Sequence, residues 1–259
     1  AKIHDIEYLI DATEELLPMH LLPERCINGT GRILYKDGTS VPVPLKTAGK
    51  DRENVICSLT IGEDLTLTGT MNSNKYDYAA FDFRNSYRKY ESQDMYLEDM
   101  ESDFPGLRVN NLTIDYLDSI YRPVGEQYDI TIRNAISPVG DMFYITPLLF
   151  HKTEKNPFKV EIREYPVDFP YLIDGTYIYE YVIPENMDIV EIPKPIKIAL
   201  PEKGGSAYYS IAVTGKKVTV SYKYSINKNM FATTEYKYLR EFFDLIIKKQ
   251  AEPIILKKI

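Results

Sequence analysis

The sequence predicts a mainly β protein made of two β-rich, sandwich-like antiparallel units. The first unit is predicted to carry a two-helix insertion and the second a C-terminal helix. Tyrosine is abundant, with 22 residues and no tryptophan, and many tyrosines alternate with polar residues, as is typical of half-buried strands. Short apolar runs separated by Gly, Pro, Asn and Asp indicate hairpins. The chain has 259 residues and 44% hydrophobic content, which is enough for two cores.

Residues 1–26 are predicted to form the end of a β-hairpin and a connector. Apolar and polar residues alternate on both sides of a break at His4-Asp5, and the alternation ends at Asp11. An amphipathic strand at the start of the chain suggests that its partner elements lie upstream. The stretch from Leu17 to Pro23 contains prolines, which remove amide donors and disfavour helix in the preceding residue, so we expect an extended connector.

Residues 27–157 are predicted to form the first β-rich unit. Turn signals at Asn28-Gly29 and Asp37-Gly38 indicate hairpins near its start. Apolar residues at helical spacing predict a helix over residues 78–90, and Ser92 is a suitable N-cap for a second helix ending near Asp103. Strands are expected at residues 32–35, 55–60, 65–70, 109–117, 128–133 and 142–149.

Residues 158–259 are predicted to form the second β-rich unit, after a boundary rich in proline and aromatic residues. A final helix is expected from Thr233 or Thr234 to Gln250, with Pro253 beyond its end. Its apolar stripe would either cover an open face of the sheet, which we favour, or bind a partner helix. The stripe consists of Tyr236, Leu239, Phe243, Ile246 and Ile247, and strands are expected at residues 177–182, 189–191, 197–199, 207–213, 218–224 and 254–256.

Composition argues against several classes of function. The formal charge of -7 and the absence of a basic stripe argue against nucleic-acid binding. No apolar run is long enough for a membrane span. Cys26 and Cys57 have neither CxxC spacing nor a nearby histidine, so we expect no metal or cofactor, and the two thiols either pair or stay reduced. The three histidines lie in unrelated sequence contexts, without metal-ligand spacing.

One segment suggests catalysis. In Tyr8-Leu9-Ile10-Asp11-Ala12-Thr13, an acid ends an apolar strand, where it is well placed to orient a histidine on a neighbouring strand. This is the role of Asp in Cys-His-Asp catalysis, in which a thiolate attacks an acyl group. The alternative interpretation is that Asp11 simply forms a turn.

This segment resembles the closing strand of a transglutaminase-like core, whose Asp-x-Thr supplies the third member of a catalytic triad. The resemblance extends along nearly the whole chain, to the region that follows such cores in bacterial multidomain proteins of unknown function. Further motifs that carry it are Leu22-Pro23-Glu24-Arg25-Cys26-Ile27-Asn28-Gly29, Asn156-Pro157-Phe158, Tyr165-Pro166-Val167-Asp168-Phe169 and Tyr238-Leu239-Arg240-Glu241-Phe242-Phe243.

The resemblance implies that Asp11 is the triad acid of a parent core whose Cys and His precede this chain. Cys26 follows Asp11, against the family order of Cys, His, Asp, and His4 lies too close to Asp11 to be the base. We therefore expect a non-catalytic accessory region, partnered by the upstream core and exported to the periplasm or outer membrane, with an envelope protein or glycan as a further partner. The alternatives are an independent glycan- or peptide-binding module, favoured by the tyrosines, and a cysteine enzyme in its own right, disfavoured by the missing nucleophile–base pair.

Overall fold

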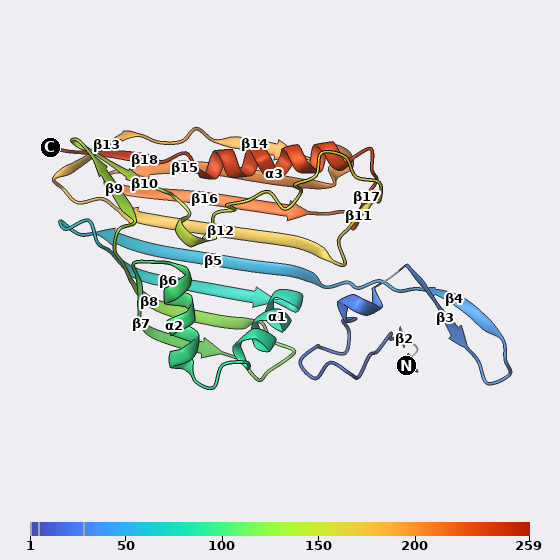
Figure 1. Cartoon of the computed structure of the whole chain (residues 1–259). Helices are drawn as coiled ribbons and strands as arrows, with labels where there is room; N and C mark the ends of the chain where they lie inside the picture. Colours follow the sequence, from blue (N-terminus) through green and yellow to red (C-terminus); the bar gives the residue numbers. More distant parts are fainter. Residues whose placement is uncertain (1, 5, 28) are drawn as a thin grey trace.

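The computed structural model describes residues 2–4, 6–27 and 29–259, and it is built around one long twisted sheet (Figure 1). Eight strands follow one another in the order β14-β15-β16-β12-β5-β6-β8-β7. All neighbours are antiparallel except β5 and β12, which are parallel. The strands are β5 (Lys50–Ile61), β6 (Leu67–Tyr76), β7 (Leu107–Asp115), β8 (Val124–Ile132), β12 (Leu172–Val182), β14 (Ile196–Ala199), β15 (Gly205–Thr214) and β16 (Lys217–Ile226). The predicted mainly β fold is confirmed.

The predicted boundary near residue 157 falls between strands of this single sheet. β5 from the first predicted unit pairs with β12 from the second, from Leu172↔Lys50 to Val182↔Thr60. One buried cluster also contains side chains from both units. The proline-rich stretch before β12 is a packed crossover, because Phe158 is buried and its ring lies 5.4 Å from that of Phe243. The two predicted units thus share a sheet and a core.

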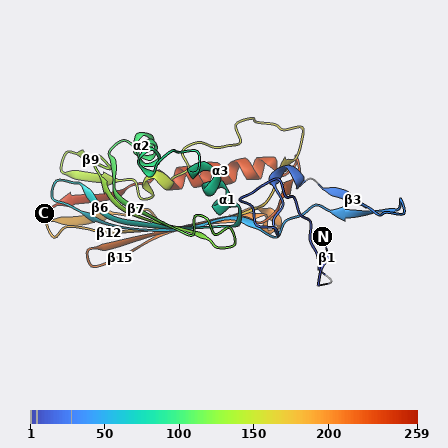
Figure 2. The same ribbon diagram turned by 90° about the horizontal axis from the view of Figure 1, so that it is seen from below.

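Three helices lie on one face of the sheet (Figure 2). They are α1 (Asp77–Tyr87), α2 (Gln93–Asp103) and α3 (Tyr236–Gln250). The Ser92 hydroxyl accepts the Met95 amide at 3.3 Å, so the predicted N-cap is confirmed. The helix α3 covers the sheet as predicted, but its buried side chains include Phe242 and Gln250 where we predicted Phe243 and Ile247. Phe243 is only partly buried. Its ring packs against Phe158 of the crossover.

A smaller sheet packs against the same core and gives the fold its sandwich-like character. Its strand order is β13-β18-β10-β9, and it too combines both predicted units. Ile145, Ile254 and Leu256 join it to the core cluster of the large sheet. The strands are β9 (Ile136–Val139), β10 (Met142–Ile145), β13 (Met187–Glu191) and β18 (Ile254–Lys258).

The N-terminal region begins with the predicted hairpin, in which β1 (Lys2–Ile3) pairs with β2 (Ile6–Glu7). The two turn residues Asp5 and Asn28 lie outside the described residues. The connector is not extended as predicted, because turns and the short 3-10 helix η1 (Glu24–Cys26) fold it against α1. The Tyr78 hydroxyl donates to the Leu22 carbonyl at 2.7 Å. Four leucines of this anchored segment (residues 8–27) are buried, namely Leu16, Leu17, Leu21 and Leu22.

Two short pairs complete the structure. The hairpin of β3 (Thr30–Leu34) and β4 (Ser40–Pro44) projects from one end of the large sheet (Figure 1). The strands β11 (Val167–Asp168) and β17 (Met230–Phe231) tie the crossover to the end of β16. Within the described chain, none of the helices has the length and apolar character needed to cross a bilayer.

Candidate functional site

Asp11, the predicted triad acid, is bonded entirely to its own segment. One carboxylate oxygen accepts the Thr13 amide at 2.9 Å and the Thr13 hydroxyl at 2.5 Å. The other accepts Arg25 and the Cys26 thiol, each at 3.1 Å. Because a carboxylate offers about four acceptor positions, these four hydrogen bonds occupy all the acceptor positions of Asp11. These hydrogen bonds hold the pKa of Asp11 well below its ordinary value, with the Thr13 hydroxyl as the largest cause.

Both thiols are free, so of the two alternatives for Cys26 and Cys57 the structure has the reduced one. The hydrogen bond to Asp11 raises the pKa of the Cys26 thiol. Burial raises that of Cys57 to about 12. Since the thiolate is the nucleophile, both environments disfavour attack on an acyl group at neutral pH.

Replacing Asp11 with Asn is expected to speed alkylation of Cys26 by iodoacetamide at pH 8. The change removes the carboxylate that disfavours the thiolate, while Arg25, which favours it, remains. Rates should be followed by mass spectrometry of the Cys26 peptide. Asp37→Asn is the matched control, because Asp37 makes the same bonds to Thr39 in a distant hairpin. An unchanged or slower rate in the Asp11 variant would contradict this account of the thiol.

The three histidines have other partners or surroundings than the two thiols. His4 sits in the N-terminal turn, and the ring of His20 lies 6.4 Å from that of Tyr121. His151 is bonded to the hydroxyl of Tyr179, and burial lowers its pKa to about 4. Within residues 2–4, 6–27 and 29–259, no histidine bonds to a cysteine, and no group of His, Cys, Asp or Glu is arranged to hold a metal ion.

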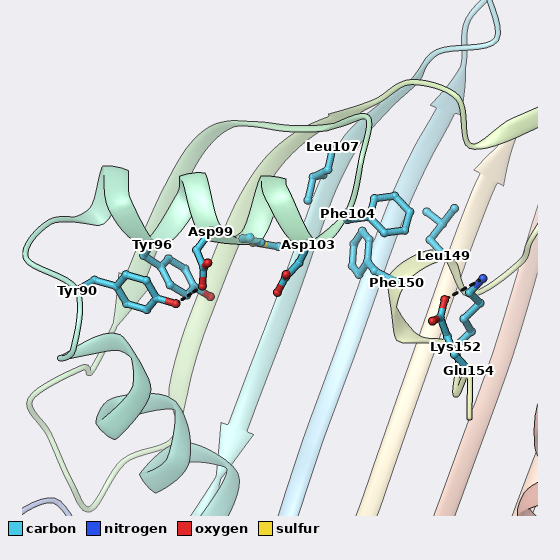
Figure 3. Close-up of a pocket in the computed structure, with 11 residues that line it drawn as sticks. Tyr90, Tyr96, Asp99, Asp103, Phe104, Leu107, Leu149, Phe150, Lys152 and Glu154 are labelled. Carbon is cyan, nitrogen blue, oxygen red and sulfur yellow. Dashed lines mark hydrogen bonds and ion pairs between the residues drawn. The ribbon is translucent and has the colours of Figure 1, made fainter. Parts of the chain in front are cut away.

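A cavity of about 430 Å³ lies between α2 and the short 3-10 helix η2 (Leu149–His151), on the helix-covered face of the sheet (Figure 3). We call it the α2 pocket. Its side chains form an aromatic and apolar floor with carboxylates around it, and its volume falls within the roughly 300–1,000 Å³ typical of ligand sites. The lining residues are Tyr90, Tyr96, Asp99, Met100, Asp103, Phe104, Leu107, Leu149, Phe150, Lys152 and Glu154.

A buried polar network lies beside the α2 pocket and fixes the orientation of Tyr96. The Tyr128 hydroxyl donates to Glu126, so the 3.1 Å contact between Tyr96 and Tyr128 has Tyr96 as its donor. Glu126 in turn pairs with Lys75, which also pairs with Glu53 at 3.0 Å. The network connects α2 to three strands of the sheet, so this side of the pocket is rigid.

Another acidic group lies at the start of β5, where burial and the nearby Asp82 and Glu53 raise the pKa of Asp51 to about 6. The folded protein therefore favours protonated Asp51, and this stabilisation is lost as pH rises from about 4 to about 6. Asp51→Asn is expected to increase the free energy of unfolding by about 1–2 kcal/mol at pH 8, and by close to nothing at pH 3.5. Urea titrations at both pH values, with exposed Asp129→Asn as control, test this; a pH-independent gain would contradict it.

The sequence did not predict the α2 pocket. Asp99 and Met100 fall within the predicted second helix, but Phe150, Lys152 and Glu154 come from a turn about 50 residues later. The two groups meet only because β7, β8, β9 and β10 bring η2 back beside α2. The predicted site residue, Asp11, lies elsewhere, bonded to the Cys26 thiol, and Cys57 is buried in the sheet.

Comparison with known proteins identifies part of the chain. A family model described as a domain of unknown function with a solved structure (DUF3858) matches residues 141–256, from the turn before β10 to β18. A DUF3858 domain is therefore present in the second half of the chain. Its strand β12 pairs with β5, which lies outside the matched residues.

A crystal structure described as that of a candidate protease from Parabacteroides distasonis is also similar, with 19% identity and a TM-score of 0.34. The similarity covers 38% of this chain and 19% of that one, so this chain spans about a fifth of the length of that protein. No curated protein matches.

Proposed function

We propose that this chain is a non-catalytic accessory region of a transglutaminase-like bacterial envelope protein, and that it holds the neighbouring core in a fixed orientation. The observation that carries the proposal is the anchored segment. Its four buried leucines, two of which pack with Tyr78, and the bond from Tyr78 to Leu22 attach residues 16–22, which follow the N-terminal hairpin, to α1. An independent binding module needs only a loose tether, whereas a region that positions its neighbour needs a rigid one.

The packing around Gly49 supports this rigid attachment. A side chain at this position would meet the Leu21 side chain at 2.4 Å and the Tyr78 ring at 3.2 Å. The segment therefore lies in close contact with the start of β5. Backbone hydrogen bonds within the segment, such as Leu21 to Pro18 at 2.9 Å and Cys26 to Pro23 at 2.8 Å, also order it.

The state of Asp11 and Cys26 supports a non-catalytic role. To orient an imidazole of a neighbouring core, Asp11 would have to exchange one of its four bonds for the new one. As long as Asp11 keeps these four hydrogen bonds, it stabilises its own segment and keeps the Cys26 thiol protonated. The envelope location of the proposed parent follows from the resemblance of the sequence motifs.

Hydrogen exchange tests the proposal. In this chain alone, the amides of Leu21, Cys26 and Ile27 should exchange about as slowly as those of α1. Adding a separately produced transglutaminase-like core should then slow exchange in residues 6–13. A double variant, Leu21→Ala with Leu22→Ala, should lose both effects, whereas Leu34→Ala, at a 77% exposed site, should keep them. Fast exchange in the anchored segment, or no change on adding the core, would count against an accessory role.

A second candidate function is a ligand-binding module, and the α2 pocket favours it. The two functions are compatible, because the pocket and the anchored segment use different residues. A thiol-reactive acyl probe that labels Cys26 stoichiometrically, with competition by a peptide amide, would instead favour an enzyme.

A further inference from the structure

We infer that the α2 pocket binds a basic side chain, lysine or arginine, of an extended peptide. The inference goes beyond the accessory role and does not depend on it. It follows from three properties of the pocket: its charge, the direction of its hydrogen bonds and the apolar character of its floor.

The charge of the pocket is negative. Three carboxylates line it, those of Asp99, Asp103 and Glu154, against the single ammonium of Lys152, which is paired with Glu154 at 3.3 Å. Asp99 and Asp103 also lie toward the C-terminal end of α2, where the helix dipole is negative and no basic residue occurs in the last turn. Two carboxylates at that end are unfavourable for the helix itself, and a bound cation would offset the cost.

The pocket offers acceptors and almost no free donors. The Tyr90 hydroxyl donates to Asp99, and the Tyr96 hydroxyl donates to Tyr128, so both use their hydrogens within the protein. Among the described residues, the Asp103 carboxylate has neither a hydrogen bond nor an ion pair (Figure 3). A ligand that only donates, such as an ammonium or guanidinium, therefore fits these groups better than one that must also accept.

The floor suits the aliphatic part of such a side chain. Phe104 and Phe150 meet edge to face at 5.3 Å, and Leu107 and Leu149 are buried beneath them. Lysine and arginine place their methylene stems on apolar surface while the charged end reaches acceptors. Aromatic rings also attract cations through their faces. A sugar would need donors from the protein as well as acceptors, and the paired Lys152 is the one cationic donor in the lining.

The test uses the whole chain with ¹³C-methyl-labelled methionine. Met100 lies in the pocket, whereas Met95 on the same helix is 47% exposed and outside the lining, so their methyl signals act as reporter and internal control. The probes are the capped peptide Ac-Gly-Leu-Lys-Leu-Gly-NH₂ and two analogues with norleucine or glutamate in place of lysine. We expect the lysine peptide to shift the Met100 methyl signal and leave the Met95 signal unmoved, with a dissociation constant of about 1 mM or below.

Removing the acceptor charge should remove the preference for lysine. The variant Asp99→Asn with Asp103→Asn is expected to bind the lysine peptide about tenfold more weakly. The matched control, Glu91→Gln with Glu98→Gln, removes two exposed carboxylates from around the same helix outside the pocket and should bind normally. Circular dichroism of both variants separates loss of binding from loss of folding.

Several results would overturn the inference. Equal binding of the lysine and norleucine peptides would show that charge is not recognised. Normal binding by the Asp99/Asp103 variant would place the peptide elsewhere, as would a shift at Met95 alone. A Met100 shift with neutral oligosaccharides but not with the lysine peptide would identify a glycan site instead. None of these results bears on the exchange behaviour of the anchored segment.

Discussion

Lys75→Met is expected to lower the free energy of unfolding by about 3–5 kcal/mol at pH 8. Lys75 lies between Glu53 and Glu126 on the helix-covered face of the sheet, and Glu126 is only 2% exposed. Methionine matches the length of the lysine stem but carries no charge. The variant therefore leaves two carboxylates close together in a poorly solvated place, without the cation that offsets their cost.

The loss should depend on pH. Burial by itself raises the pKa of Glu53, but the Lys75 ammonium, together with His151 and the Ser73 hydroxyl, holds this pKa below its ordinary value. In the wild type this favourable interaction is present above the unfolded pKa and is lost as pH falls. In the variant Glu53 lacks the ammonium that favours its ionised form, so it is easier to protonate, and stability is lost as pH rises instead. Both trends make the difference in the free energy of unfolding between the wild type and the variant smaller at pH 4.5 than at pH 8.

Urea denaturation at the two pH values measures the effect. Lys223→Met, at an exposed position of β16, is the matched control and should change stability by less than about 0.5 kcal/mol. Adding Glu126→Gln to Lys75→Met should restore part of the loss, because it removes one uncompensated charge. If Lys75→Met were as stable as the control, the network would be unimportant for folding.

Arg84→Met is expected to cost at least about 3 kcal/mol, for a different reason. Arg84 is fully buried in α1 and donates to four backbone carbonyls in the connection between β7 and β8. The acceptors are Tyr116, Leu117, Ser119 and Arg122, at 2.8–3.1 Å. Without the guanidinium, these carbonyls lose their partner in a place with little water, and the connection loses its attachment to the helix.

Arginine is specifically required at this position. Arg84→Lys keeps the charge, but an ammonium is a compact donor and cannot reproduce the planar fork that reaches several carbonyls, so an intermediate loss is expected. The control is Arg88→Met, one turn later, because Arg88 is 40% exposed and its ion pair with Asp118 lies at the surface. Hydrogen exchange at the Ser119 and Arg122 amides should be faster in the two Arg84 variants and unchanged in Arg88→Met.

Equal stability of Arg84→Met and Arg88→Met would contradict this account of Arg84.

The sequence predicted local elements well, since turn residues and apolar periodicity act over a few neighbours. The N-cap at Ser92 and the stop at Pro253 illustrate this. It was less successful where a residue is decided by distant contacts: the leucines of the anchored segment looked like a connector because their partner, Tyr78, lies more than 50 residues away. The structural role of Arg84 could not be predicted from the sequence, because its acceptors are backbone carbonyls, which every residue has.

In the candidate sites, too, local motifs could be predicted from the sequence and contacts between distant segments could not. The pattern around Asp11 was visible because Asp-x-Thr is a local motif, and its bonds to Thr13 were found. The alkyl and aromatic lining of the α2 pocket could not be inferred, because the pocket forms only where α2 and η2 meet above the sheet.

Strand content, the helical insertion and the final helix followed from residue order alone, because backbone preferences and alternating polarity are properties of short stretches. The joining of β5 to β12 across the predicted boundary was decided by the folded chain. So were the network around Lys75 and the pocket beside it. The parallel pairing joins segments more than 100 residues apart, and the Lys75 ion pairs join residues of three different strands. The energies of both arise only when burial removes water from both partners at once.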